Sequence, residues 1–199
     1  MKLVVGTDST WSLRALICAE LVNIKFDVEV INLTADNYKR QILTYSPTGL
    51  VPALIHDELV LHDSLAIVEY FNEYADGLLY PQAVNERALA RSLCSEMHSG
   101  FSQIRTVCPF TLDEVTPLTT YSSEMTAELE RISEIFASAQ LPFMFERSGI
   151  VDAFYAILAF RLQTYGVELA GKAGEYQQSL LNWPLLQYAI KQAQRWRKV

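Results

Sequence analysis

The pattern of apolar residues changes at Asp76 and Gly77, and this change limits the folds that the chain can adopt. Before it, short apolar runs typical of strands alternate with helical patterns. After it, apolar residues recur mainly every three or four positions, which is typical of helices packed on one face. The sequence therefore predicts two domains, an α/β domain over residues 1–76 and an all-helical domain over residues 82–199.

The first domain is expected to run in the order βαβ and then ββα, which makes a mixed sheet. Strands are predicted at residues 3–5, 26–33, 51–56 and 59–61, the last two joined as a hairpin by the turn at Asp57 and Glu58. Residues 7–10 supply capping side chains for a first helix, and Asp63 and Ser64 do the same for a later one.

The second domain is expected to contain five helices. One apolar stripe predicts a single long helix that begins after Pro81 and carries Leu89, Leu93, Met97, Phe101, Ile104 and Cys108. A second stripe runs through Met125, Leu129, Ile132 and Phe136. Residues 152–165 are apolar on all sides over most of their length, which predicts a buried central helix with Gly149 at its N-cap. Two shorter helices are predicted near residues 175–181 and 184–196.

Composition excludes several function classes. The 199 residues include 16 Lys and Arg against 23 Asp and Glu, so the net charge is 16 − 23 = −7. An acidic chain is a poor binder of nucleic acid or of anionic membranes. Apolar runs stay well below the length that spans a bilayer, so no membrane partner is expected. Three Cys and three His without a cluster argue against a metal and for a reduced, cytoplasmic protein.

Polar residues gather at two junctions between a strand and a helix. Residues 9–12, Ser-Thr-Trp-Ser, open the first helix, where free amides and the positive helix end favour an anion such as a thiolate. Pro52 at a strand start raises the possibility of a cis bond that turns the backbone of Val51 outward. From the local sequence alone, helix capping is the favoured interpretation of Ser9 and also of Asp63 and Ser64.

Taken together, these segments resemble the cytosolic glutathione transferases. The resemblance rests on Ser-x-x-Ser-x-Arg at Ser9, on residues 46–54 (SPTGLVPAL) and on residues 63–70 (DSLAIVEY), in that order and spacing. The hydroxyl-rich start is most similar to the serine-type, zeta-like and related bacterial members. The resemblance implies a thioredoxin-like first domain that binds glutathione and a helical second domain that forms the pocket for the second substrate.

The resemblance also implies roles for individual residues. Ser9 is placed where a hydroxyl donates to the glutathione sulfur, with Ser12 and then Thr10 as alternatives. The residues implied to bind glutathione are Trp11, Leu50, Val51, Pro52, Asp63 and Ser64. Leu50 departs from the family, because related members often carry Lys or Gln there, and this puts the affinity for glutathione in doubt.

For the second-substrate pocket the candidates are His98, Phe101, Arg105, Tyr155 and Tyr165, although a core role suits Phe101 equally well. The implied activity is glutathione transfer to, or isomerisation or reduction of, a small electrophile, in a cytoplasmic homodimer that detoxifies. The alternative is a non-enzymatic binding or regulatory protein that keeps the fold. Thiol–disulfide exchange is disfavoured because residues 9–12 contain no cysteine.

Overall fold

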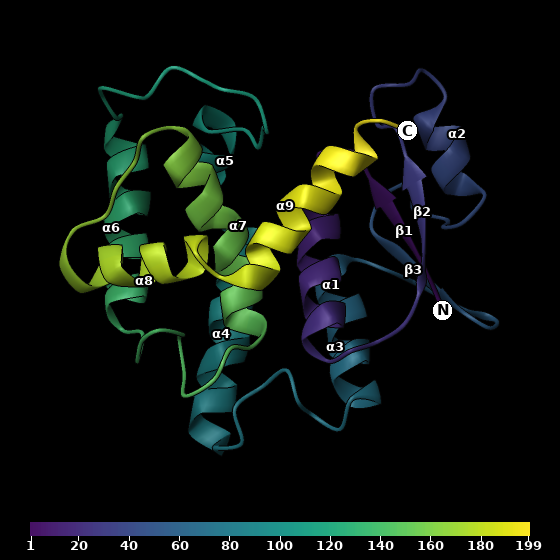
Figure 1. The fold of residues 1–199 in the computed structure, drawn as a ribbon, viewed down its shortest axis with the longest axis horizontal. Coiled ribbons are helices and arrows are strands. Elements are labelled where there is room, and N and C mark those ends of the chain that lie inside the picture. The colour runs from purple at the N-terminus through teal and green to yellow at the C-terminus, as the bar shows by residue number, and fades with distance from the viewer. The chain divides into compact units, whose positions relative to one another are not determined.

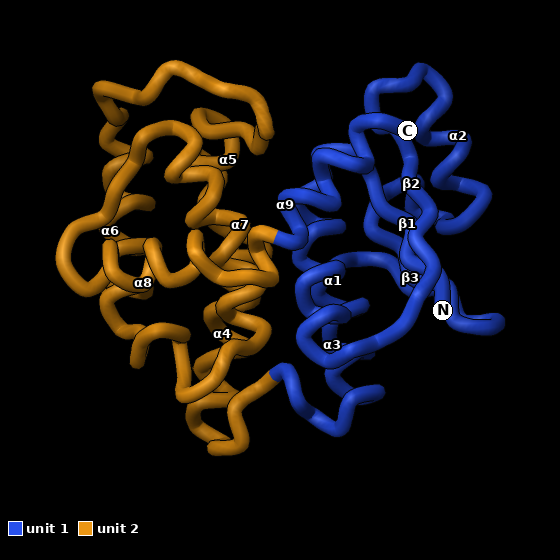
Figure 2. Tube along the Cα trace, in the orientation of Figure 1, with its two compact units in different colours: residues 1–79, 188–199 blue, residues 80–187 orange.

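The computed structural model describes all 199 residues and divides them into two compact units. The first unit contains residues 1–79 together with residues 188–199, and the second contains residues 80–187 (Figure 2). The expected boundary near residues 76–82 is therefore close to the observed one. The observed division differs at the other end of the chain, because residues 188–199 had been expected in the helical domain.

The first unit is built on a four-stranded mixed sheet. Its elements are β1 (Lys2–Gly6), α1 (Thr10–Leu21), β2 (Asp27–Ile31), α2 (Tyr38–Leu43), β3 (Ala53–His56), β4 (Leu59–His62) and α3 (Ser64–Tyr74) (Figure 1). The strand order is β2-β1-β3-β4, with β1 parallel to β2 and antiparallel to β3. The predicted order βαβ then ββα and the mixed sheet are confirmed.

Two apolar layers hold this sheet in place. On one face, Val4, Ile31 and Ala53 pack with Ile42 of α2. Helices α1 and α3 pack against each other beside the sheet and bury a large set of side chains, among them Leu13, Ile17, Ile67, Val68 and Phe71. The sheet is thus covered by helices, and its strand ends are the parts left to form a site.

The second unit is helical. Its elements are α4 (Val84–Ser99), α5 (Ser102–Val107), α6 (Ser123–Ala137), α7 (Ile150–Thr164) and α8 (Gly171–Leu181), and α9 (Pro184–Trp196) begins in it. Helix α7 is the predicted central helix, buried on all sides from Ile150 to Ala159 and in contact with α4 and α8. Gly149 is its N-cap, as predicted.

The prediction of one long helix after Pro81 is wrong. Helix α4 begins only at Val84 and ends at Ser99, and α5 starts three residues later. Phe101 at the junction is in the left-handed conformation, with φ of 57°. The guanidinium of Arg105 donates to the carbonyl oxygens of Met97, His98 and Gly100, which otherwise have no helical partner. The apolar stripe continues through the break because both short helices bury the same side.

Leu89 also differs from the prediction, because it is 49% exposed rather than part of the buried stripe. No helix is long and apolar enough to cross a membrane.

Candidate functional site

Ser9 caps α1 with its side chain. Its Oγ accepts a hydrogen bond from the Ser12 amide at 3.2 Å, and its backbone is extended, as an N-cap requires. A hydroxyl that accepts one hydrogen bond keeps its own proton to donate. The chain offers that proton no acceptor. Capping uses a lone pair of the Ser9 oxygen and donation to a bound thiolate would use its hydrogen, so the two interactions are compatible.

The two alternatives to Ser9 have different surroundings. Ser12 is completely buried, and its hydroxyl accepts from the Gly6 amide at 3.2 Å. This bond ties the start of α1 to the end of β1. Thr10 is the first residue of α1 and is also buried. The geometry therefore favours Ser9 over Ser12, because Ser12 is fully enclosed whereas Ser9 is 7% exposed at the cap of the helix.

Trp11 is half-buried and stacks under a buried arginine. The Arg14 guanidinium lies 4.6 Å from the centre of the Trp11 ring. This cation–π contact fixes the first turn of α1 and holds a positive charge one turn from Ser9. Trp11 thus has a structural partner, and its predicted contact with glutathione stays a prediction.

The turn that precedes β3 contains a cis peptide bond between Val51 and Pro52. Val51 lies outside the hydrogen-bonded ladder of the sheet, which begins with Ala53. Its amide and carbonyl are therefore available to an extended ligand. Leu50, immediately before it, is 67% exposed.

The N-terminus of α3 is formed by two adjacent polar residues with different tasks. Asp63, with φ of 71°, is the N-cap, and its carboxylate accepts from the amides of Leu65 and Ala66 at 2.8 and 3.2 Å. Ser64 is the first residue of the helix and only 2% exposed. Its Oγ is buried and has no hydrogen-bond partner. A buried hydroxyl without a partner is unfavourable, and the positive end of a helix is a natural place for an anion.

The sheet register brings these three segments together. Ala53 pairs with Val4 of β1 and with His62 of β4, and these are the last pairs of β3 at this end of the sheet, so Gly6, Val51 and Ser64 all lie two residues beyond them. A Cβ added at Gly6 would lie 2.8 Å from a methyl group of Val51. Gly6 leads directly into the loop that ends at Ser9. The end of the sheet in the first unit therefore carries the Ser9 hydroxyl, the free backbone of Val51 and the N-terminus of α3.

The predicted pocket residues all lie in the second unit, and three of them have interior partners there. Arg105 binds the carbonyls that end α4, and burial lowers the pKa of its guanidinium. The hydroxyl of Tyr155 donates to the Leu93 carbonyl at 3.1 Å, and that of Tyr165 donates to the Pro109 carbonyl at 3.0 Å. The rings of Phe101 and Tyr155 are in edge contact. His98 lies half-buried in the last turn of α4.

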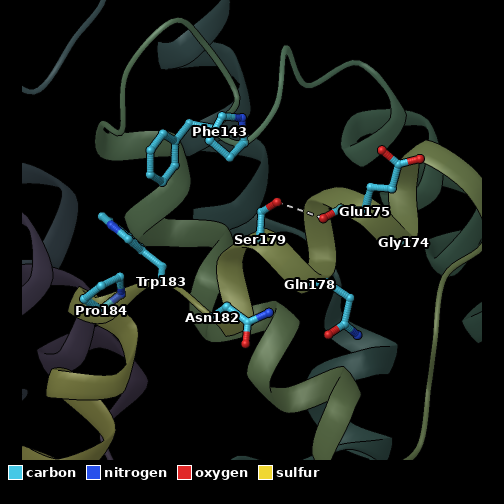
Figure 3. A pocket seen from close by; sticks show the side chains of 9 residues that line it. Phe143, Gly174, Glu175, Gln178, Ser179, Asn182, Trp183 and Pro184 are labelled. Atoms are coloured by element: carbon cyan, nitrogen blue, oxygen red, sulfur yellow. Dashed lines mark hydrogen bonds between the residues drawn. The ribbon is translucent and has the colours of Figure 1, made fainter.

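A groove in the second unit lies apart from all of these residues. It has a volume of about 640 Å³ and is lined by Pro142, Phe143, Gly174, Glu175, Gln178, Ser179, Asn182, Trp183 and Pro184. Figure 3 shows the Phe143 and Trp183 side chains at one end and polar side chains along α8. The Ser179 hydroxyl donates to the Glu175 carbonyl at 2.9 Å. The groove contains no buried charged group that would bind a ligand.

Comparison with known proteins identifies the first unit. Residues 8–73 match the sequence profile described as the N-terminal domain of glutathione S-transferase. The chain has a glutathione S-transferase N-terminal domain. The matched range contains Ser9, Val51, Asp63 and Ser64, so the glutathione S-transferase profile covers every segment that meets at the end of the sheet.

Relatives and solved structures extend this result. The chain is 32% identical over 91 residues to glutathione S-transferase 1 of Dianthus caryophyllus, covering 45% of this chain and 41% of that protein. It is 30% identical over 97 residues to a probable maleylacetoacetate isomerase of Caenorhabditis elegans, covering 48% of this chain and 45% of that protein. These alignments span less than half of the relatives' length.

The whole chain resembles a solved structure. A Burkholderia glutathione transferase homologue with bound glutathione superposes with a TM-score of 0.73 at 21% identity, over 98% of this chain and 97% of the other. The chain therefore has the glutathione transferase fold throughout, including the helical part that the family profile does not reach. The predicted fold class is confirmed.

One contact at this end of the sheet was not predicted from the sequence pattern. Arg197 donates from Nε to the Asp8 carboxylate at 2.7 Å, and Asp8 directly precedes Ser9. The two residues are 189 positions apart, so no local pattern in the sequence predicts their contact. The one available clue is the acidic residue beside the proposed catalytic serine.

Proposed function

We propose that this chain is a glutathione transferase that activates the thiol of glutathione for attack on a small electrophilic substrate, or for its isomerisation or reduction. The observation that carries the proposal is the Ser64 hydroxyl, which is buried without a partner at a helix N-terminus. Ser64 and Val51 both lie two residues beyond the Ala53–His62 pair, at the end of the sheet from which the chain runs to Ser9. A carboxylate ligand would satisfy that hydroxyl.

Glutathione has the chemical groups that these residues require. Its γ-glutamyl carboxylate would accept from the Ser64 hydroxyl and lie at the positive end of α3. The exposed Asp63 carboxylate would bind the neighbouring ammonium group. The amide and carbonyl of Val51 would pair with the cysteinyl residue as an added strand does. This arrangement directs the thiol toward the start of α1.

Ser9 would lower the pKa of the bound thiol. A free thiol with a pKa of about 8.5 is only about 3% ionised at pH 7. Lowering that pKa by about two units, worth roughly 2.7 kcal/mol, makes the thiolate the main form. A hydroxyl hydrogen bond to a charged sulfur together with the helix end is of the required size. The thiol proton passes to solvent, and the Ser9 proton stays on its oxygen.

The thiolate then attacks an electrophilic carbon, so that a new C–S bond forms with the sulfur electron pair. In a transfer reaction the leaving group departs with the electrons of the bond that it loses. His98, Phe101, Arg105, Tyr155 and Tyr165 remain candidates for contact with that substrate. The interior hydrogen bonds of Arg105, Tyr155 and Tyr165 give each a structural task as well.

The test is a calorimetric titration with glutathione, followed by ultraviolet thiolate absorbance of the complex across pH. We expect a bound thiol with a pKa well below its free value. Ser9→Ala should return that pKa toward 8.5 and lower kcat/KM at pH 7 roughly 30-fold, since only about 3% of a free thiol is ionised there. Unchanged turnover in Ser9→Ala would show that another group activates the thiol.

Ser122→Ala is the matched control, because Ser122 caps α6 by accepting from the Met125 amide at the same 3.2 Å. Both variants lose a helix cap, at a cost of about 1 kcal/mol. Only Ser9→Ala should alter the thiolate signal. Ser12→Ala should act chiefly on stability, because its hydroxyl binds the Gly6 amide.

The second candidate is a binding or regulatory protein without catalysis, and the exposed Leu50 favours it. Glutathione transferases often carry Lys or Gln at this position, so the glycyl end of glutathione would lose a polar partner. No heat on titration at millimolar glutathione, with a folded protein, would support this candidate. Thiol exchange has no support, because Cys18 is fully buried and burial raises the pKa of its thiol.

We also propose a cytoplasmic homodimer that acts in detoxification. All three cysteines are free and buried, which suits a reducing compartment. The edge strand β4 exposes Leu59 and Val60, an apolar pair that a second copy would cover. Sedimentation equilibrium of the protein and of Val60→Lys would test the dimer, and cell fractionation would test the compartment.

A further inference from the structure

The last twelve residues of the chain are part of the first unit. Ala189, Ala193 and Trp196 are buried along α9, whose final turns lie beside α1 (Figure 1). The Tyr188 hydroxyl donates to the Glu20 carboxylate at 3.3 Å. The end of the chain is therefore packed into the first unit and is hydrogen-bonded to the helix that Ser9 caps.

Arg197 extends this contact to the loop between β1 and α1. Its Nε donates to the Asp8 Oδ1 at 2.7 Å, and the two side chains are only 28% and 36% exposed. Partial shielding from water makes such an interaction stronger than one on an open surface. Arg197 thus holds the residue next to Ser9.

Asp8 occupies a backbone conformation that needs support. Its φ is 57°, in the left-handed region, which Asp tolerates better than most residues but still at a cost. On one side of it, the Thr7 amide donates to the Ile31 carbonyl and the Thr7 hydroxyl accepts from the Leu33 amide. On the other side, the Ser9 amide donates to the Gly6 carbonyl. The Asp8 side chain is fixed by Arg197.

We infer that Arg197 is a positioning residue for Ser9, acting through Asp8 from the far end of the chain. This inference rests on the proposed function. The contact holds the turn that presents the Ser9 hydroxyl, and it also neutralises a carboxylate one residue from the place where the thiolate forms. Without Arg197 that carboxylate would repel the thiolate and leave the turn less firmly held.

The test compares Arg197→Gln, Arg197→Lys and Asp8→Asn with the double variant of Arg197→Gln and Asp8→Asn. We expect Arg197→Gln to raise the pKa of the bound glutathione thiol by roughly half a unit, because an unpaired charge near water has an effect of this size. The expected loss in kcat at pH 7 is a few-fold, with KM changed less. Arg197→Lys keeps the charge and should restore most of the thiol pKa.

The double variant separates the charge from the geometry. Once Asp8 is neutral, Arg197 has no carboxylate to hold, so replacing it should shift the thiol pKa only as the loss of a nearby charge does, and the part that depends on the contact should not add. Lys198→Gln is the matched control, because it removes the same charge one residue later from an exposed side chain. A thiol pKa in Arg197→Gln equal to that in Lys198→Gln, or fully additive effects, would overturn the inference.

Hydrogen exchange gives a second measurement that does not depend on glutathione. Peptides covering residues 6–13 should exchange faster in Arg197→Gln than in Lys198→Gln. If the unaltered protein forms no glutathione thiolate, the proposed function fails and the exchange comparison alone decides whether Arg197 positions the turn. Equal exchange in the two variants would then overturn the positioning role.

Discussion

Two helix N-termini of this protein each bury a polar side chain, and the two side chains differ in their hydrogen bonding. At α7, the Asp152 carboxylate accepts from the amides of Gly149 and Met144, each at 2.8 Å, and from the Tyr176 hydroxyl at 2.7 Å. At α3, the Ser64 hydroxyl is buried and accepts or donates nothing. The carboxylate at one end is satisfied by the chain, and the hydroxyl at the other end is buried without a partner.

The difference separates stability from binding. Buried polar groups in proteins are nearly always paired, so an unpaired one needs an explanation. At α7 the pairing explains why an acidic residue is buried in the middle of the helical unit. At α3 the proposed glutathione carboxylate would supply the missing partner. Substitutions at the N-terminus of α7 should therefore change stability, and substitutions at the N-terminus of α3 should change binding.

The largest effect is expected from Asp152→Ala, which leaves three buried donors unpaired. We expect the free energy of unfolding to fall by about 3–5 kcal/mol, since each unsatisfied buried group costs about 1–3 kcal/mol. Urea denaturation measures the loss. The affinity of the folded fraction for glutathione should stay unchanged.

Glu124→Ala is the control for Asp152→Ala, because Glu124 is also an acidic residue in the first turn of a helix but is fully exposed. Its replacement should change stability only slightly. A loss as large as that of Asp152→Ala would show that burial is not the cause.

The next effect is a dependence of stability on pH. Burial raises the pKa of Asp152 from 3.8 to about 6, although its three hydrogen bonds oppose the shift. The folded state then binds a proton more tightly than the unfolded state. The contribution of Asp152 is therefore most favourable below about pH 4 and is lost as the pH rises to about 6, by up to about 3 kcal/mol.

Thermal unfolding of the unaltered protein and of Asp152→Asn across pH 4–7 isolates this contribution, because all other carboxyl groups are common to both. The stability gap between them should narrow as the pH rises through this range. A gap that widens would mean that the hydrogen bonds outweigh burial.

Ser64→Ala should act on binding. The hydroxyl has no partner in the free protein, so the free energy of unfolding should change by less than about 0.5 kcal/mol or rise slightly. Glutathione affinity should fall roughly ten- to hundredfold, because a hydrogen bond to a charged group is worth about 1.5–3 kcal/mol. Scanning calorimetry measures the stability, and titration calorimetry measures the affinity for glutathione. A loss of stability with unchanged affinity would reverse the comparison between the two helix ends.

The smallest effect is expected from Leu50→Lys, which adds a cation at an exposed position beside Val51. An exposed ion pair with the glycyl carboxylate is worth less than about 1 kcal/mol, so affinity should tighten by only a few-fold at low salt. Leu50→Gln should tighten the affinity less than Leu50→Lys. An unchanged affinity at low salt would place the glycyl end away from residue 50.

The sequence predicted the parts of the site that local chemistry determines. The capping residues at Ser9 and Asp63 and the hairpin follow from residue types within a few positions of each other, whereas the cis bond before Pro52 was expected only through the family resemblance. Even there, Asp63 rather than Ser64 is the cap, because a carboxylate one residue earlier reaches the first amides of the helix. The orphan hydroxyl of Ser64 could be found only once its surroundings were known.

Other features depend on contacts between distant residues and left no local pattern. The break between α4 and α5 is stabilised by the side chain of Arg105, which reaches back to three carbonyls, while the apolar spacing continues across it. The placement of residues 188–199 in the first unit and the contact of Arg197 with Asp8 likewise depend on tertiary packing.

The membership of residues 188–199 in the first unit also has a consequence for synthesis. Residues 1–79 are synthesised before the second unit, and 187 − 80 + 1 = 108 residues separate them from the segment that completes the first unit. At about 5–20 residues per second, the nascent first unit waits roughly 5–20 seconds without its last helical turns. During that interval the part of the first unit that residues 188–199 later pack against is open to chaperones, and the proposed glutathione site acquires the Arg197 contact only after the second unit has been made.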